Sequence, residues 1–211
     1  DPRRSLRLQW NTSTQSPSMS QLQNVVDNSN PLALSAGNTS LRQTYTHTLS
    51  LRFSNTDPMK SRSAFVYLNV TRTSDPIANS TFTALRDTSI DGIALARGTQ
   101  LTRPVNLDVS YGANAFGVIS RPTPWLKSIV SLNGGLSWNR TPTRINGLIN
   151  RADSYVWRAG AVLASNISAN LDFTVSYFGN WNRSRNSLST NNTSGDYFNH
   201  VASLRLNAIV G

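Results

Sequence analysis

The chain has 211 residues, enough for one large all-β domain or two small ones. Its 20 Lys and Arg against 10 Asp and Glu give a net charge of +10, although only 14% of the residues are charged. The arginines are scattered singly along the chain, which argues against a nucleic-acid partner, because such proteins cluster their basic residues. Without a cysteine, the chain has no disulfide framework, cysteine-ligated zinc or thiol nucleophile.

The sequence shows neither the pattern of a membrane helix nor that of a signal peptide. No apolar run approaches the roughly 18 residues that a membrane helix needs. No basic start followed by a short apolar stretch marks a signal peptide. The chain opens with DPRRS and has no initiator Met. We therefore expect a processed chain or a piece of a longer one.

Alternation of apolar and polar residues, which is the signature of a half-buried strand, recurs eight times along the chain. The predicted strands are SLRLQW (5–10), TYTHTLSLRFS (44–54), SAFVYLNVT (63–71), VNLDVSYGANAFG (105–117), VSLNGGLSW (130–138), YVWRAGAVL (155–163), LDFTVSYFGNW (171–181) and FNHVASLRLNA (198–208). Phe178 faces the polar side against the alternation. It is either a contact on that side or a sign that the register shifts by one residue.

The connections between these strands alternate in length. Short turns are predicted at 55–61, 120–128 and 165–170. Long polar connections are predicted at 11–39, 140–153 and 183–196. We expect residues 74–100 to be the far ends of two long strands, with DTSIDG (87–92) at the tip. Alternating short and long connections are typical of an up-and-down meander and of membrane β-barrels.

Three features favour a membrane barrel over a soluble sandwich. The polar face consists mostly of Ser, Thr, Asn and Gly, and the only two lysines, Lys60 and Lys127, lie in short turns. The stretch 171–181 has 11 residues, close to the roughly 9–11 that cross the hydrocarbon as a tilted strand. Four tryptophans occupy the apolar side near the long connections, where membrane barrels place interfacial aromatic residues: Trp10, Trp138, Trp157 and Trp181. The predicted fold class is an all-β, antiparallel up-and-down transmembrane β-barrel with about eight strands in this chain.

Three segments resemble outer-membrane barrels of the TonB-dependent receptor type, within the outer membrane β-barrel family. These are NPLALSAGNTSLRQTYTHTLSLRF (30–53), LTRPVNLD (101–108) and SNISANLDFTVSYFGN (165–180). Thr39, Arg42 and Gln43 stand where that pattern has proline and acidic residues. The resemblance implies the C-terminal half of a barrel of about 22 strands, which encloses a plugged lumen.

On this basis residues 1–211 form a single barrel segment without a plug domain. The alternative is a complete eight-stranded barrel. Such a barrel must fill its interior with side chains, and the polar face here is rich in small residues. We therefore favour the segment of a larger barrel.

Charged residues on the polar side are the candidate site residues. They are predicted to face the lumen: Arg7, Arg42, Arg52, Asp108, Arg158, Asp172 and Arg205. A cationic lumen would steer anionic solutes, whereas the simpler hypothesis pairs these groups with acidic residues on a plug or on further strands. Asp108 and Asp172 are also a conceivable acid/base pair, although pairing of each with arginine is favoured.

Catalysis is not predicted. His47 and His200 both fall on the apolar side, and no metal-ligand spacing or phosphate-binding loop occurs. No nucleophile with a base and an orienting group can be assembled. We therefore expect no enzyme and no cofactor.

The predicted location is the bacterial outer membrane, and the predicted function is the wall and outer loops of a TonB-dependent-type transport barrel for nutrient uptake. Its partners would be outer-membrane lipid, the remaining strands and plug of a larger barrel, TonB-type energy coupling and a surface lipoprotein, and not nucleic acid. Two alternatives are a structural or adhesive outer-membrane barrel without transport and a soluble β-rich binding module.

Overall fold

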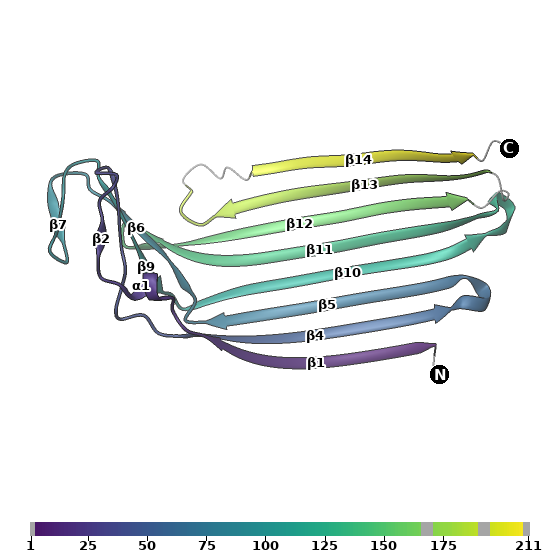
Figure 1. Cartoon of the computed structure of the whole chain (residues 1–211), viewed down its shortest axis with the longest axis horizontal. Coiled ribbons are helices and arrows are strands. Elements are labelled where there is room, and N and C mark those ends of the chain that lie inside the picture. The colour runs from purple at the N-terminus through teal and green to yellow at the C-terminus, as the bar shows by residue number, and fades with distance from the viewer. Residues whose placement is uncertain (1–2, 166–170, 190–194, 209–211) are drawn as a thin grey trace.

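A computed structural model describes residues 3–165, 171–189 and 195–208. Eight long strands follow one another as an antiparallel meander, each paired with its neighbours in the chain (Figure 1). Their bounds are β1 Arg4–Gln15, β4 Thr44–Asp57, β5 Arg62–Ser74, β10 Val109–Thr123, β11 Ser128–Ile145, β12 Leu148–Ser165, β13 Leu171–Asn186 and β14 Gly195–Ala208. The all-β class is confirmed, and the eight strands predicted from the alternation are the long strands of this meander. The described residues contain six further short strands, so the expected total of about eight is too low.

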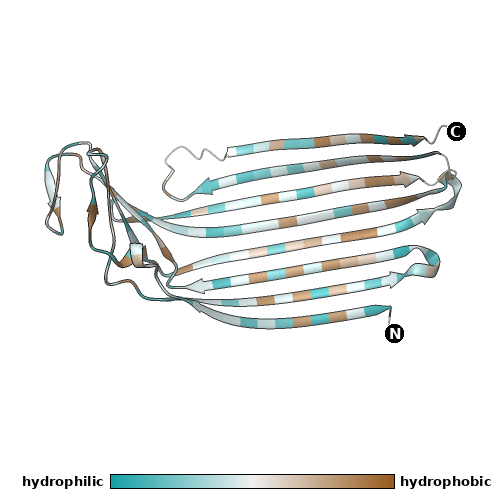
Figure 2. Ribbon diagram, in the orientation of Figure 1, coloured by the Kyte–Doolittle hydropathy of each residue, from teal (hydrophilic) through white to brown (hydrophobic). Residues whose placement is uncertain are grey.

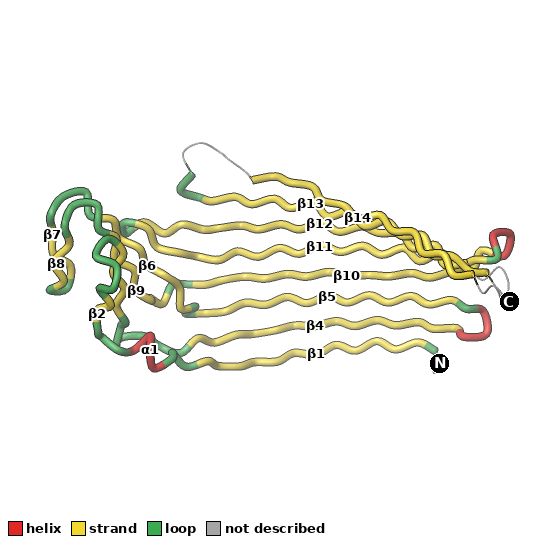
Figure 3. Tube along the Cα trace, turned by 45° about the horizontal axis from the view of Figure 1, so that its top comes forward, coloured by secondary structure: helices red, strands yellow, loops and turns green. Residues whose placement is uncertain are grey.

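Two of the short turns are tight 3-10 turns. They are η1, Pro58–Lys60, between β4 and β5, and η2, Pro124–Leu126, between β10 and β11. In each, a proline with its fixed φ opens the turn, and a left-handed residue closes it, Ser61 at φ 49° and Lys127 at φ 45°. Figure 3 shows both at the end of the sheet opposite α1. The third predicted turn, 165–170, lies almost entirely outside the described residues.

The register keeps the apolar side chains of all eight strands on one face. Leu68 of β5, for example, lies opposite Leu51 of β4 and Ala115 of β10. Apolar and polar bands accordingly alternate along each strand (Figure 2). On β5 the apolar side chains are exposed, whereas Tyr67, Asn69 and the other polar-face residues between them are half-buried. On this strand the polar face is therefore the more enclosed of the two.

The sheet is open in the part of the chain that the structure describes. There, β1 pairs only with β4, and β14 pairs only with β13. Every residue of both edge strands is exposed to solvent. Such an edge presents a row of unpaired backbone groups, which cannot be left in lipid without a partner.

The hairpin of β5 and β10 continues beyond the other strands, as predicted for residues 74–100. Its outer part consists of β6 Ile77–Thr83, β7 Thr88–Ile90, β8 Ile93–Leu95 and β9 Gln100–Asn106. The register persists without a shift from Ser74 opposite Val109 to Thr88 opposite Leu95. Asp75, with φ at 50°, interrupts the strand between β5 and β6. The tip is the Asp91–Gly92 turn.

The prediction of one long polar connection at 11–39 is wrong in detail. Strand β1 extends to Gln15, and three short elements follow it: α1 Met19–Leu22, β2 Val26–Asp27 and β3 Ala33–Ala36. Strand β3 pairs in parallel with β9. Together with β6 to β9 these elements form a unit at the long-connection end (Figure 1), here called the loop-end domain (residues 19–36 and 77–106). Its core consists of Leu34, Ala36, Ala84, Leu95 and Leu101.

The prediction of a polar connection at 140–153 is also wrong. Strands β11 and β12 continue as a hairpin that ends in a two-residue turn at Asn146 and Gly147, with φ at 47° and 82°. Two successive positive φ values define the type I′ turn, for which Asn-Gly is the preferred sequence. The hairpin end pairs with the loop-end domain, because Arg144 lies opposite Ser80 of β6. The connection predicted at 183–196 is shorter, since β13 reaches Asn186.

Candidate functional site

Five of the seven predicted lumen charges lie on the polar face of the long strands. Arg7 of β1 lies directly opposite Arg52 of β4. Arg158 lies opposite Asn180, and Arg205 lies opposite Thr174. The fifth, Asp172, accepts a hydrogen bond of 2.8 Å from the side-chain amide of Asn207.

Arg42 and Asp108 do not lie on a strand, which corrects the prediction for these two residues. Arg42 is exposed, and its guanidinium forms an ion pair of 2.7 Å with Asp75. The carbonyl oxygen of Asp108 accepts a hydrogen bond of 3.3 Å from the backbone N–H of Asp75. Both belong to the junction between the sheet and the loop-end domain. Because Asp172 lies at the short-turn end, the two aspartates cannot act as an acid/base pair.

Aromatic residues cross the middle of the polar face. Phe65 and Phe116 lie on neighbouring strands with ring centroids 6.4 Å apart, and the Arg52 guanidinium lies 5.2 Å from the Phe65 ring centre. Phe178 lies opposite Gly160 in an unbroken register. Its inward orientation is therefore a packing contact and not a register shift. Sequence reasoning noted Phe178 but missed the other two rings, which lie with Tyr67 among the small polar residues of this face.

A cavity of about 410 Å³ lies at the long-connection end, between the loop-end domain and the β11–β12 hairpin. Arg103 of β9 lines it, forms an ion pair with Asp91, and donates hydrogen bonds of 3.3 Å to Asn24 and to the carbonyl of Gly37. Arg144 lines the same cavity. Because these residues come from distant parts of the chain, no local sequence pattern could have indicated the cavity. The guanidinium groups of Arg103 and Arg144 and the side-chain amides of Asn24 and Asn38 could bind a polar or anionic group in this cavity.

The predicted interfacial tryptophans lie in two adjacent rows of the apolar face. Trp10 and Trp138 belong to one row, since the register connects them through Leu49, Val70 and Ala113. Trp157 and Trp181 lie opposite each other one row closer to the short turns, with ring centroids 5.8 Å apart. Their place at the membrane interface stays a prediction.

A polar cluster adjoins Trp138 on the same face. The Asp153 carboxylate accepts hydrogen bonds of 2.8 and 2.9 Å from Arg140 and one of 3.1 Å from the Trp138 indole. The hydrogen bonds from Arg140 are the main cause that holds the pKa of Asp153 below its ordinary value, and burial opposes them. Sequence reasoning missed this cluster because it assigned both charged residues to a loop.

The histidines serve as packing residues. His47 stacks on Trp10 at 6.0 Å, and His200 stacks on Tyr177 at 5.8 Å. Within the described residues, no group of three or more His, Asp or Glu could hold a metal ion. No helix there is long and apolar enough to cross a membrane.

Comparison with known protein families gives one match. Residues 1–207 match the model of the outer membrane protein beta-barrel family. The chain therefore belongs to this family, and its location is the bacterial outer membrane. No curated protein and no solved structure matches the chain in the corresponding searches.

Proposed function

We propose that this chain forms part of the wall and the outer loops of an outer-membrane transport barrel of the TonB-dependent type, which takes up a nutrient. The observation that carries the proposal is the pair of open edges. Strands β1 and β14 are exposed along their whole lengths, so each of these edges needs a strand to pair with in lipid. A barrel of about 22 strands provides such partners and a lumen wide enough to be plugged.

The composition of the polar face supports a large lumen. Gly112, Gly135 and Gly160 lie on this face together with many Ser, Thr and Asn side chains. Eight closed strands would require an interior that is densely filled throughout, whereas on this face a few large side chains such as Phe65, Phe116 and Phe178 stand among many small residues. A wide lumen occupied by a plug or by water imposes no such requirement.

The loop-end domain supports a role in capture. It folds around its own buried core, in which Leu95 and Leu101 are each 2% exposed. A core of this kind holds the cavity around Arg103 and Arg144 in one place outside the sheet. Long connections of outer-membrane barrels face the exterior. The cavity is therefore in a position to meet a solute before it enters the lumen.

The proposal requires several partners. A plug and the TonB coupling protein would drive the transport, and a surface lipoprotein would help to capture the solute. Exposed apolar residues of the loop-end domain, among them Val25 at 71% and Leu32 at 65%, supply a surface for such a lipoprotein. The same surface also suits an adhesive barrel without transport, which is the second candidate function.

Uptake measurements on cells that carry the intact protein separate these possibilities. A panel of bulky labelled solutes would be offered with and without a protonophore, next to cells that lack the protein. We expect uptake of at least one bulky solute, abolished by the protonophore. Passive entry of small solutes would indicate an open pore, and surface binding without any uptake would indicate adhesion. Either result contradicts the proposal.

A further inference from the structure

At the short-turn end of the sheet, the residues that end the apolar face differ in charge from strand to strand. On β1 and β5, the last residue in the apolar register is an arginine, Arg4 and Arg62. On β10 the last residue in this register is Thr123, and Arg121 is the one before it. On β4, between β1 and β5, the last such residue is Asp57. On β11, β12 and β14, the corresponding residues are uncharged, namely Ser128, Ser165 and Ala208. The arginines therefore form a local cluster on neighbouring strands and not a ring around the whole sheet.

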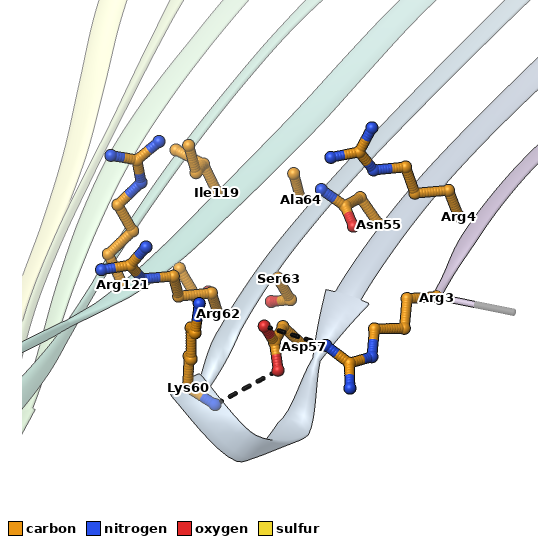
Figure 4. A pocket seen from close by; sticks show the side chains of 11 residues that line it. Arg3, Arg4, Asn55, Asp57, Lys60, Arg62, Ser63, Ala64, Ile119 and Arg121 are labelled. Carbon is orange, nitrogen blue, oxygen red and sulfur yellow. Dashed lines mark hydrogen bonds and ion pairs between the residues drawn. The ribbon is translucent and has the colours of Figure 1, made fainter. Parts of the chain in front are cut away.

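These arginines line a pocket of about 290 Å³ together with Arg3 and Lys60. Arg62, Arg121 and Lys60 lie on one side of its opening, and Arg3 and Arg4 lie on the other (Figure 4). We call this group of five cationic residues the turn-end basic cluster.

Among the described residues, a single acidic one, Asp57, lines the pocket. It forms an ion pair of 3.4 Å with Arg3 and accepts a hydrogen bond from the backbone N–H of Lys60. Within residues 3–165, 171–189 and 195–208, no acidic partner lies within ion-pair distance of Arg4, Arg62 or Arg121. The pocket therefore carries a large excess of positive charge.

The position of the cluster along the strands places it at the edge of the apolar surface. Ala64 and Ile119 line the pocket and begin the apolar runs of β5 and β10. On β5, Arg62 and Arg72 enclose this run on the same face, ten residues apart, which corresponds to about 33 Å along the strand. This length matches an apolar band roughly 25 Å tall that tilted strands cross.

We propose that the turn-end basic cluster binds the headgroup of an anionic glycerophospholipid. Short turns of outer-membrane barrels face the periplasm, so the cluster lies at headgroup level of the leaflet on that side. Guanidinium groups bind phosphate oxygens through paired, charge-assisted hydrogen bonds. The acyl chains would continue upward along the apolar side chains that begin at Ala64 and Ile119. A soluble anion would gain nothing from that adjoining surface.

This inference rests on the outer-membrane location and is independent of transport. The test uses the intact protein purified in neutral detergent and native mass spectrometry. Retention of phosphatidylglycerol is compared with that of phosphatidylcholine carrying the same acyl chains. We expect preferential retention of phosphatidylglycerol, lowered about tenfold or more in the triple variant Arg4→Gln, Arg62→Gln, Arg121→Gln. Arg72→Gln is the matched control from the opposite edge of the same strand and should retain lipid as the wild type does.

A second variant should increase the retention of phosphatidylglycerol instead of lowering it. Asp57→Asn removes the carboxylate that lines the pocket and keeps an oxygen that can accept the Lys60 N–H. We expect this variant to retain more phosphatidylglycerol, and the comparison remains informative if the triple variant fails to fold. Equal retention of the two lipids, or no response to Asp57→Asn, would overturn the proposal. Displacement of the lipid by millimolar inorganic phosphate would instead assign the site to a free anion and overturn it as well.

Discussion

Phe178 of β13 covers Gly160 of β12 on the polar face of the sheet. A Cβ atom on residue 160 would lie 2.3 Å from a carbon of the Phe178 ring and 2.9 Å from the side-chain oxygen of Asn133. Only a residue without a Cβ atom therefore leaves room for the ring at this position. This contact fixes the register of the two strands from the polar side.

Gly160→Ala should destabilise the folded protein by about 1–3 kcal/mol, because the added methyl group displaces the ring. The free energy of unfolding from liposomes in urea measures this loss. Gly117→Ala is the control, since a Cβ there has its nearest neighbour at 3.5 Å. The double variant Gly160→Ala, Phe178→Leu should recover part of the loss. Equal stability of Gly160→Ala and Gly117→Ala would contradict the contact.

A second prediction concerns the two faces of β13. Val175 is 41% exposed on the apolar face, and Ser176 points to the polar face next to Ser203. Val175→Arg should cost about 2–4 kcal/mol if the residue lies in mid-bilayer. Ser176→Arg should cost much less because its charge stays in the lumen. The yield of folding into liposomes compares the two, and similar yields would exclude lipid as the partner of the apolar face.

The Asp153 cluster should make the end of the β11–β12 hairpin sensitive to acid. The pKa of Asp153 is lower in the folded protein, so its contribution is complete above the unfolded pKa and is lost as the pH falls through the folded pKa. The protection factors for hydrogen exchange at residues 140–153, which are corrected for the intrinsic pH dependence of exchange, should therefore fall below about pH 4. Asp153→Asn should remove this pH dependence and cost about 1 kcal/mol at neutral pH, a small value because Arg140 is partly solvated. Unchanged protection factors in acid would contradict the prediction.

The loop-end domain should unfold separately from the sheet. Leu101→Ala removes a side chain that is 2% exposed, which costs about 2–5 kcal/mol in a packed core. Hydrogen exchange in residues 77–106 should then increase, while the heat-modifiable gel mobility of the barrel stays unchanged. Val66→Ala, on the apolar face of β5, is the control and should leave the loop-end domain protected. Loss of gel mobility in Leu101→Ala would show that the two parts fold as one unit.

The strands were predictable because their alternation is local. Leu68 and Val70 face one way and Asn69 the other, and the period of two is visible without any tertiary information. The same applies to the turns, where Asp57-Pro58 and Pro124 mark the ends of strands. The Asn146–Gly147 turn was missed although its dipeptide is a hairpin signal, because the flanking residues, Arg144-Ile145 and Leu148-Ile149-Asn150, do not continue the alternation of apolar and polar residues.

Long-range relationships could not be predicted from the sequence. Arg103 and Asn24 lie within hydrogen-bond distance in the cavity beside the loop-end domain, although they are 79 positions apart in the sequence. Arg42 was assigned to the polar face by extending the alternation, but its chain segment leaves the sheet before Thr44. Closure of the sheet depends on partners for β1 and β14, and no local pattern encodes these partners.

Cysteine labelling tests the central claim, a sheet with one face toward lipid and one toward a lumen. The chain has no cysteine of its own, so single substitutions at residues 64–70 of β5 and 173–177 of β13 each report one position. A membrane-impermeant maleimide would be applied to the intact protein in outer-membrane vesicles opened by osmotic shock. We predict that labelling rates alternate, fast at Asn69 and Ser176 and slow at Leu68 and Val175. Equal labelling of both faces, or faster labelling of the apolar one, would contradict the account.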